Sequence, residues 1–360
     1  MIMRRFSSGA MREGFIATIA AGLDAQLEAV REAIPASAGA VASYIPELGQ
    51  ANASTFGAAL CSVRGDVHSV GHDRLPFSIQ SCVKPFTYLM ACDEIGMETT
   101  HEHVGREPSG DTYNSFRLTK TGLPFNPMIN AGAIAICNLL GRGLSADDRF
   151  ARLQETIRAA ATDDGLAFAE GGGVHFGFDP QVYTSERESG FTNIALAHYI
   201  RAHRATSGDT PCTVEDNLDL YFRACSQTCD VRAAAVLAAT LASGGISPFS
   251  GKRRFAQRHV SSAVQLMFSC GMYDDSGAWA CKVGLPAKSG VAGCILIVVP
   301  NVLGIAVISP PLDATGNSVR GRALVEGLAT DYNLNVFSQL MLGNHEDIVG
   351  HVSCASFLSL

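Results

Sequence analysis

The chain has 360 residues, 47% of them hydrophobic, and this composition can bury a large core without disulfide bonds. The formal net charge is -7, from 27 basic and 34 acidic residues, and no long block of lysine or arginine is present. This balance argues against a nucleic acid or an anionic membrane as partner and favours a small-molecule substrate.

The cysteine pattern gives no sign of a disulfide framework or a metal site. Eleven cysteines are scattered along the chain without a C-x-x-C pair. His101 and His103 lie close together, but no Cys/His cluster has the spacing of zinc ligands. The N-terminal stretch also lacks the apolar core of a signal peptide. We therefore expect a cytoplasmic protein with reduced, mostly buried thiols, no metal and no organic cofactor.

The first part of the chain predicts a helix and then a hairpin. Apolar residues recur at helical spacing between Phe15 and Ile34, which is typical of an amphipathic helix that ends before Pro35. In FGAALCSVRGDVHSVGH, short apolar runs lie on either side of Arg64-Gly65-Asp66. This pattern predicts two antiparallel strands joined by a tight turn.

Helical periodicity dominates the middle of the chain, from Ser81 to about Val264. It is clearest in NIALAHYI (193–200) and VRAAAVLAATLA (231–242). Glycine-rich segments interrupt the pattern, and they predict loops between the helices.

Strand-like runs return between Trp279 and Pro310, and a further helix is expected over 318–332. The longest apolar stretch, 291–312, has the length of a membrane span. The segment PNVLG interrupts it at a turn, so two short buried strands are the better interpretation.

Strands at both ends and helices between them predict a mixed α+β fold. Since an isolated hairpin is seldom stable, we expect the two groups of strands to form one antiparallel sheet flanked by helices. Residues 1–80 and 265–342 would build this sheet-containing domain. Residues 81–264 would form an inserted, mainly helical domain, and 343–360 a loosely ordered tail.

The segment FSIQSCVKPF (77–86) places Ser81 three residues ahead of Lys84 in apolar surroundings. Pro85 is typical of a first helical turn, and residues three apart share a helix face, so the amine can reach the hydroxyl. Burial favours a neutral lysine, which can take the proton of a serine nucleophile. The alternative is a chance pair on a solvated helix face.

A second motif strengthens the catalytic interpretation. Lys288-Ser289-Gly290 opens the C-terminal strands, and a Lys-Ser/Thr-Gly strand beside an S-x-x-K helix is the pairing of β-lactamases and penicillin-binding proteins. The expected fold is therefore of this type, with the helical domain inserted. The N–H groups of Ser81 and Val291 would together form an oxyanion hole.

Between these motifs the chain resembles the serine-dependent glutaminases, which share that fold. The matching segments occur in order from 44 to 321: YIPEL, QSCVKP, VGREPSGDTYNS, NPMINAGAI, SERESG with Asn193 following, YFRACS, LASGGISP, SCGMYDDSG, LPAKSGVAG and SPPLDATGNSVRG. Ala292 and Cys294 depart from the usual glycines, and both are expected to point away from the face that Val291 presents if the segment continues as a strand.

The resemblance implies hydrolysis of the side-chain amide of L-glutamine to L-glutamate and ammonia. Ser81 would attack the amide carbon and Lys84 would take its proton. Tyr44 and Tyr273 resemble the active-site tyrosines of the family, which can relay a proton to the leaving nitrogen. The resemblance also implies a homo-oligomer, a dimer or a tetramer.

The resemblance further implies a set of substrate ligands. Glu186 matches the acidic ligand of the α-amino group, and Ser289 would assist beside the oxyanion hole that Ser81 and Val291 form. The polar residues around the substrate are Asn130, Asn193, Tyr221 and Tyr273. Simpler roles stay open: Asn130 and Asn193 as helix caps, Tyr221 as a core aromatic, Tyr273 as a surface aromatic, and Glu186 as part of a solvated charged run.

Two other functions are compatible with the sequence. One is a different serine acyl hydrolase of the same fold, a β-lactamase or an esterase, although a serine-aspartate-asparagine motif is lacking. The other is a protein that senses glutamine without catalysis, but such a sensor has no need of a nucleophile and its base.

Overall fold

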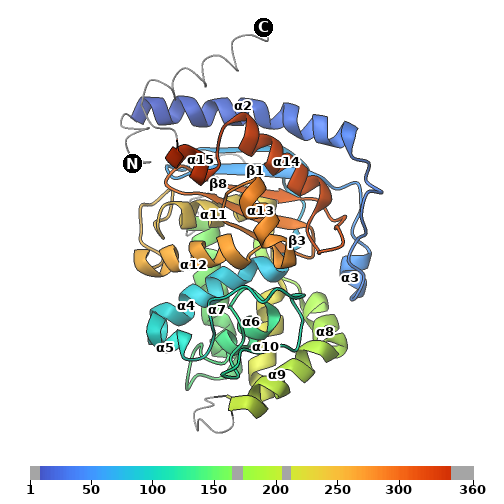
Figure 1. Ribbon diagram of the computed structural model, residues 1–360, viewed down its shortest axis with the longest axis vertical. Helices are drawn as coiled ribbons and strands as arrows, with labels where there is room; N and C mark the ends of the chain where they lie inside the picture. The colour runs from blue at the N-terminus through green and yellow to red at the C-terminus, as the bar shows by residue number, and fades with distance from the viewer. Residues whose placement is uncertain (1–8, 164–172, 205–211, 342–360) are drawn as a thin grey trace.

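The computed structural model describes residues 9–163, 173–204 and 212–341 (Figure 1). The tail expected over 343–360 lies outside the described residues. Within the described ranges, no helix is both long enough and apolar enough to cross a membrane.

A five-stranded antiparallel sheet combines strands from both ends of the described chain, in the order β2-β1-β8-β7-β6. The strands are β1 (Gly57–Ser62), β2 (Val67–Gly71), β6 (Ala287–Gly290), β7 (Cys294–Val299) and β8 (Leu303–Ile308). β1 pairs with β8 from Gly57 opposite Ile308 to Ser62 opposite Leu303. The single sheet predicted from the sequence is therefore confirmed, and so is the division of 291–312 into two strands.

Helices cover both faces of the sheet because its central strands are apolar on both sides. α2 (Gly9–Ala33) and α14 (Val319–Asp331) lie over one face, and α11 (Val231–Ala242) lies under the other (Figure 1). Along β7, Ile295 and Ile297 point into the core under α2 and α14. Leu296 and Val298 point into the core on the opposite face, with α11. This alternation is the two-residue period of a strand.

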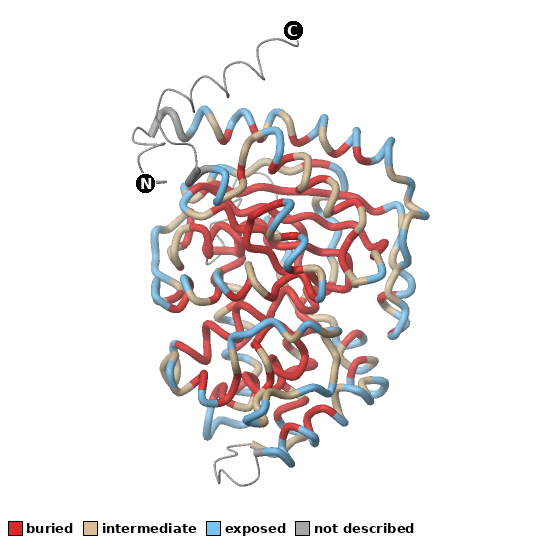
Figure 2. The backbone as a smooth tube through the Cα atoms, in the orientation of Figure 1, coloured by how far each residue is buried: buried red, intermediate tan, exposed pale blue. Residues whose placement is uncertain are grey.

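Most of the remaining helices form the second body of the molecule, but Trp279 and Val336, from the last two of them, pack in the core that α2 and α14 cover. The remaining helices are α3 (Pro46–Gly49), α4 (Lys84–Ile95), α5 (Met97–His101), α6 (Asn130–Cys137), α7 (Ala146–Thr162), α8 (Pro180–Ser189), α9 (Phe191–Arg204), α10 (Val214–Cys225), α12 (Gln257–Cys270), α13 (Ser276–Lys282) and α15 (Val336–Met341). Buried residues of most of these helices join those of α11 and the sheet in one core, which Figure 2 shows as the red centre of the molecule.

The structure also contains elements that the sequence did not predict. A small sheet joins β3 (Phe77–Ser78), β5 (Gln227–Cys229) and β4 (Phe176–Phe178), and the last two lie inside the part expected to be helical. α11 lies within 81–264 but packs on the large sheet. The division of the chain at residues 81 and 264 therefore stays a prediction.

The strand-like character expected from Trp279 onward is wrong for its first residues. Trp279 lies in α13, is fully buried, and donates from Nε1 to the carbonyl oxygen of Leu285 at 2.7 Å. The large apolar ring is anchored in the core by this bond, and tertiary packing outweighs its strand preference. The strands begin only at Ala287.

Gly132 marks a close approach between α6 and the backbone that precedes it. A Cβ atom at this position would lie 1.8 Å from the carbonyl oxygen of Asn126. We predict that Gly132→Ala lowers the free energy of unfolding by about 2 kcal/mol or more, because α6 has to shift to admit the methyl group. The urea midpoint measures this effect.

Gly14→Ala provides the matched control. Gly14 is exposed on α2, and a Cβ atom there meets nothing within 4 Å. Its replacement should stabilise the protein by about 0.5–1 kcal/mol through helix propensity. An unchanged midpoint for Gly132→Ala would contradict the close approach.

Candidate active site

Ser81 lies where a short turn runs into a longer helix. The turn is the 3₁₀ helix η1 (Gln80–Val83), and α4 follows it directly with Pro85 in its first turn. Lys84 adopts a helical backbone (φ -58°, ψ -41°) although it precedes proline. Ser81 therefore lies in the first turn, where backbone N–H groups have no intrahelical acceptor.

Two residues beside Ser81 have left-handed backbones. Gln80 has φ 48°, and Tyr273, in the 3₁₀ turn η4 (Tyr273–Asp275), has φ 57°. Neither is glycine, so each conformation costs on the order of 1 kcal/mol. Such conformations persist only where the surrounding contacts hold them, and both side chains are buried.

Lys84 and Ser81 form a buried pair. The Nζ atom of Lys84 lies 2.7 Å from Oγ of Ser81 and 2.7 Å from Oδ1 of Asn130. Lys84 is only 1% exposed, and this burial lowers its pKa from 10.5 to about 8. A neutral amine in this position can donate to Asn130 and accept the proton of Ser81.

Asn130 and Asn193 extend the polar chain from Lys84. Nδ2 of Asn130 donates to Oδ1 of Asn193 at 2.9 Å, which leaves Oδ1 of Asn130 directed at Lys84. Asn130 begins α6 but does not cap it, and Asn193 lies inside α9. The structure therefore does not favour the alternative of two helix caps.

Glu186 and its hydrogen-bond donors form a second group of polar residues in the site, here called the acidic wall. Glu186 is 4% exposed, unlike its neighbours Arg187 and Glu188, so the solvated-run alternative does not hold for this residue. Its Oε1 accepts from the hydroxyl of Tyr44 at 2.8 Å and from Nε2 of Gln80 at 3.2 Å. Burial raises the pKa of Glu186, and these two donors oppose the rise.

Tyr44 is half exposed, but its hydroxyl points inward to Glu186 and to Oε1 of Gln80, at 3.2 Å from the latter. Burial of the hydroxyl and the nearby Glu186 carboxylate raise the pKa of Tyr44 well above its usual value. Its hydrogen bonds thus lead to Glu186, while the predicted proton relay would require contact with Lys84 or the leaving group.

The strand β6 brings Lys288 and Ser289 to the site. The hydroxyl of Tyr273 donates to the carbonyl oxygen of Ser289 at 2.9 Å, and Nζ of Lys288 lies 4.4 Å from the centre of the Tyr273 ring. Nζ also donates to the carbonyl oxygens of Ser289 and Gly271, at 2.6 and 3.2 Å. Tyr273 is thus a buried member of the site and not a surface aromatic.

The pKa values of Lys288 and Tyr273 both differ strongly from their usual values. Burial and the neighbouring Lys84 lower the pKa of Lys288 to about 7. Burial raises the pKa of Tyr273 well above its usual value, and hydrogen bonds with Ser81 and Ser289 partly oppose this rise. Oγ of Ser289 is buried and has no hydrogen-bond partner within the described residues.

Val291 lies in the turn between β6 and β7, so the expected continuation of the strand through 291–295 is wrong. Gly293 has φ 94° and makes the turn possible. A Cβ atom on Gly290 would lie 3.0 Å from the carbonyl oxygen of Ile79 and 3.1 Å from Sγ of Cys82. This close approach brings the end of β6 against the segment that carries Ser81.

Tyr221 lies on α10, 4% exposed, in the apolar core and beside Phe222. Burial raises its pKa well above the usual value, and Glu186 and Tyr44 contribute to the rise. The residue therefore lies near the acidic wall, and both a core role and a ligand role stay compatible with this position.

The structure adds three residues to the predicted site. Gln80 bridges Tyr44 and Glu186, Lys288 supports Tyr273, and the ring of Tyr113 lies 4.8 Å from that of Tyr273. Gln80 and Lys288 are the neighbours of Ser81 and Ser289 in the matched motifs, and this adjacency is the sequence feature that could have identified them. Tyr113 comes from an irregular loop, whose path no periodicity predicts.

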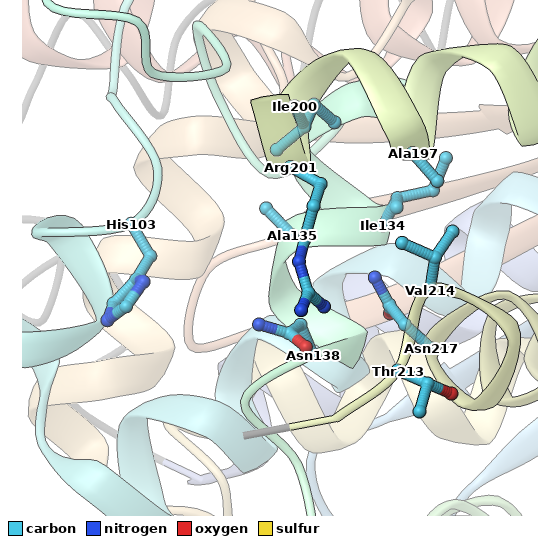
Figure 3. A pocket seen from close by; sticks show the side chains of 10 residues that line it. All are labelled: His103, Ile134, Ala135, Asn138, Ala197, Ile200, Arg201, Thr213, Val214 and Asn217. Carbon is cyan, nitrogen blue, oxygen red and sulfur yellow. The ribbon is translucent and has the colours of Figure 1, made fainter. Parts of the chain in front are cut away.

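A small hollow of about 40 Å³ lies at the far ends of the helices that carry the asparagines (Figure 3). The polar ends of Asn138, Arg201 and Asn217 point toward one another in it. Asn138 lies about two helical turns beyond Asn130, and Arg201 lies about two turns beyond Asn193. The hollow is thus separate from the Ser81–Lys84 pair.

Comparison with known proteins gives a consistent result. The family model described as "Glutaminase" matches residues 39–337. "Glutaminase" from Nostoc sp. is 40% identical over 317 residues, which are 88% of this chain and 90% of that protein. "Glutaminase liver isoform, mitochondrial" from Rattus norvegicus is 40% identical over 84% of this chain, and the match spans only 48% of that longer protein.

A solved structure agrees with this result. "Crystal Structure Analysis of Mglu in its tris and glutamate form" superposes with a TM-score of 0.79 at 34% identity, and it covers 90% of this chain and 68% of that one. The β-lactamase-like fold with an antiparallel sheet is confirmed.

The bond between Tyr44 and Glu186 can be tested by titration. Tyr44→Phe removes a donor that lowers the pKa of Glu186, so we predict a higher pKa for this carboxyl group in the variant. The protonated acid should then persist to higher pH. Carbon NMR of protein labelled at the glutamate carboxyl groups follows this titration.

Tyr199→Phe serves as the control because Tyr199 is partly exposed on α9, outside this cluster. An unchanged Glu186 titration in Tyr44→Phe would show that the bond does not control this carboxyl group.

Proposed function

This chain belongs to the glutaminase family, and on that premise we propose that it hydrolyses the side-chain amide of L-glutamine to L-glutamate and ammonia. The chain spans about half the length of several relatives, such as the rat liver isoform, and nine tenths of the Nostoc protein. The proposal concerns the reaction of the Ser81 site.

The observation that carries the proposal is the contact of 2.7 Å between Nζ of Lys84 and Oγ of Ser81 in an apolar interior. A lysine with a pKa of about 8 is partly neutral near physiological pH, so it can remove the serine proton. No histidine is needed for this step.

In the first half of the reaction, Ser81 attacks the amide carbon of glutamine while its proton passes to Lys84. The backbone N–H groups of Ser81 and Val291 hold the oxyanion. The C–N bond then breaks, the proton reaches the leaving nitrogen, and ammonia departs. The product is a glutamyl ester of Ser81.

In the second half, water attacks the ester carbon and Lys84 accepts the water proton. The bond to Oγ of Ser81 breaks, Lys84 returns the proton to Oγ, and glutamate leaves. Tyr273 is suited to assist the proton transfers, because its hydroxyl is buried near Ser81 and donates to the carbonyl oxygen of Ser289. Lys288 packs against Tyr273, with Nζ 4.4 Å from the centre of the ring. This route needs no metal or organic cofactor.

Glutamine carries an ammonium group, and Glu186 is the proposed ligand for it. The hydrogen-bond donors to this buried carboxylate, Tyr44 and Gln80, are neutral, which favours a cationic ligand. Neutral groups of Asn130, Asn193, Tyr221, Tyr273 and Ser289 would hold the α-carboxylate and the side chain. The glutamate form of a related structure supports a site for this amino acid.

We further propose a cytoplasmic setting and a homo-oligomer. The ten cysteines of the described residues are free thiols, which agrees with the reducing cytoplasm. A homo-oligomer, either a dimer or a tetramer, is proposed from the family resemblance alone.

Ammonia release from L-glutamine is the direct test. We expect release by the wild type and a loss of about 10³-fold or more in Ser81→Ala, since nucleophile and base act as one unit. Ser338→Ala, on the exposed side of α15, should retain full activity.

Two parallel assays address the other functions. Cleavage of a chromogenic β-lactam without ammonia release would indicate a different acyl hydrolase. Thermal stabilisation by glutamine without ammonia release would indicate a sensor, and either result would refute the glutaminase proposal.

The pH dependence tests Lys84 as the base. Activity should rise with pH through about pH 8, because the required amine becomes neutral as pH passes the lysine pKa. Asn130→Asp places a carboxylate 2.7 Å from Nζ and should raise this pKa, which moves the rise upward by about 1–2 pH units.

Asn138→Asp, on the same helix but in the hollow of Figure 3, should leave the profile unchanged. A profile for Asn130→Asp that coincides with the wild type would argue against Lys84 as the titrating base.

A further inference from the structure

A groove of about 370 Å³ lies beside the proposed active site, between α3, β3, the first turn of α8 and the turn that carries Val291. α3 and α8 are neighbours at one edge of the molecule (Figure 1). Ser81 and Lys84 do not line the groove, so it is separate from the buried pair. Its volume is that of a site for a small molecule.

The groove carries charge of one sign only. Glu47 and Asp179 line it, and no lysine, arginine or histidine does so among the residues that the structure describes. Most of the other lining side chains are apolar, including Leu48, Phe77 and Ile308. Such a lining suits a ligand that combines positive charge with an apolar body.

One face of α8 sets the distance between the two carboxylates. Asp179 directly precedes the helix, Val182 follows three residues later, and Ser185 three residues after that, so they lie along one face. The hydroxyl of Ser185 donates to Oε1 of Glu47 at 2.9 Å. Because six helical residues span about 9 Å, the two carboxylates are held that far apart along α8, with the apolar side chain of Val182 between them.

Each carboxylate is fixed through one oxygen atom, which leaves the other for a ligand. Oδ1 of Asp179 caps α8 by accepting from the backbone N–H groups of Gln181 and Val182, at 2.8 and 3.2 Å. Oε2 of Glu47 is buried and has no hydrogen-bond partner within the described ranges. A buried carboxylate oxygen without a donor is costly, and an ammonium group supplies both the donor and the opposite charge.

We propose that this groove binds a small aliphatic diamine, with one ammonium group at Glu47, the other at Asp179 and the methylene chain along Val182. In extended 1,5-diaminopentane, six bonds of about 1.5 Å in a zigzag separate the nitrogen atoms by about 7.5 Å. Each ammonium group can therefore reach its carboxylate. This binding is independent of the reaction at Ser81.

Isothermal titration of the full chain with 1,5-diaminopentane tests the proposal. Pentylamine and 1,5-pentanediol are the comparison probes, with one charge and with none. Ionic strength is held constant with sodium chloride, because salt screens contacts between charges. We expect saturable binding of the diamine, about ten-fold or more tighter than binding of pentylamine, and no saturable binding of the diol.

Glu47→Gln and Asp179→Asn each remove one charge and preserve size, and asparagine can still cap α8. Each variant should weaken diamine binding about ten-fold or more and abolish the advantage of the diamine over pentylamine. Glu188→Gln is the matched control, because Glu188 is exposed on the same helix and does not line the groove. Glu186→Gln should also bind as the wild type does, since Glu186 lies outside the groove.

The proposal is overturned if the wild type does not bind the diamine. It is also overturned if pentylamine binds equally well, because one carboxylate would then suffice. Unchanged affinity in both groove variants, or a loss of binding in Glu186→Gln alone, would place the diamine elsewhere and would likewise refute the groove as its site.

Discussion

The burial of the Lys84 amine is the constraint on which the site depends. An ammonium group in an apolar interior is costly, and the fall of its pKa from 10.5 to about 8 corresponds to about 3 kcal/mol. The surrounding elements all act on this one group: η1 brings the hydroxyl of Ser81, α6 brings the amide of Asn130, and α4 positions Nζ between them. The fold thus keeps the amine of Lys84 partly neutral at a pH where an exposed lysine would be protonated.

Much of this arrangement could be predicted because it depends on local spacing. The helix period of α2, the hairpin at Gly65 and the Ser81–Lys84 pair are each encoded within one or two turns of chain. The long-range joining of the two strand groups also followed, since β1 and β2 alone would be marginal. The family resemblance supplied Glu186, which no local pattern separates from Glu188.

The remainder depended on tertiary contacts that no window of sequence contains. Trp279 enters a helix because its indole finds an acceptor in the core. Gln80 and Tyr113 reach the site through a left-handed turn and an irregular loop, and neither leaves a periodic signal. The small sheet of β3, β4 and β5 is too short for alternation to appear.

The pairing of β1 with β8 has a consequence for the order in which the protein can acquire its structure. During synthesis β1 emerges early, but its central neighbour emerges only after all the helices from α4 to α13. The edge of β1 that pairs with β8 therefore stays unpaired until β8 is synthesised, and the large sheet forms late. The intervening helices, including α11, which packs on this sheet, are made before the sheet is complete. Nascent chains arrested before Leu303 should therefore expose an unpaired strand edge and be vulnerable to aggregation.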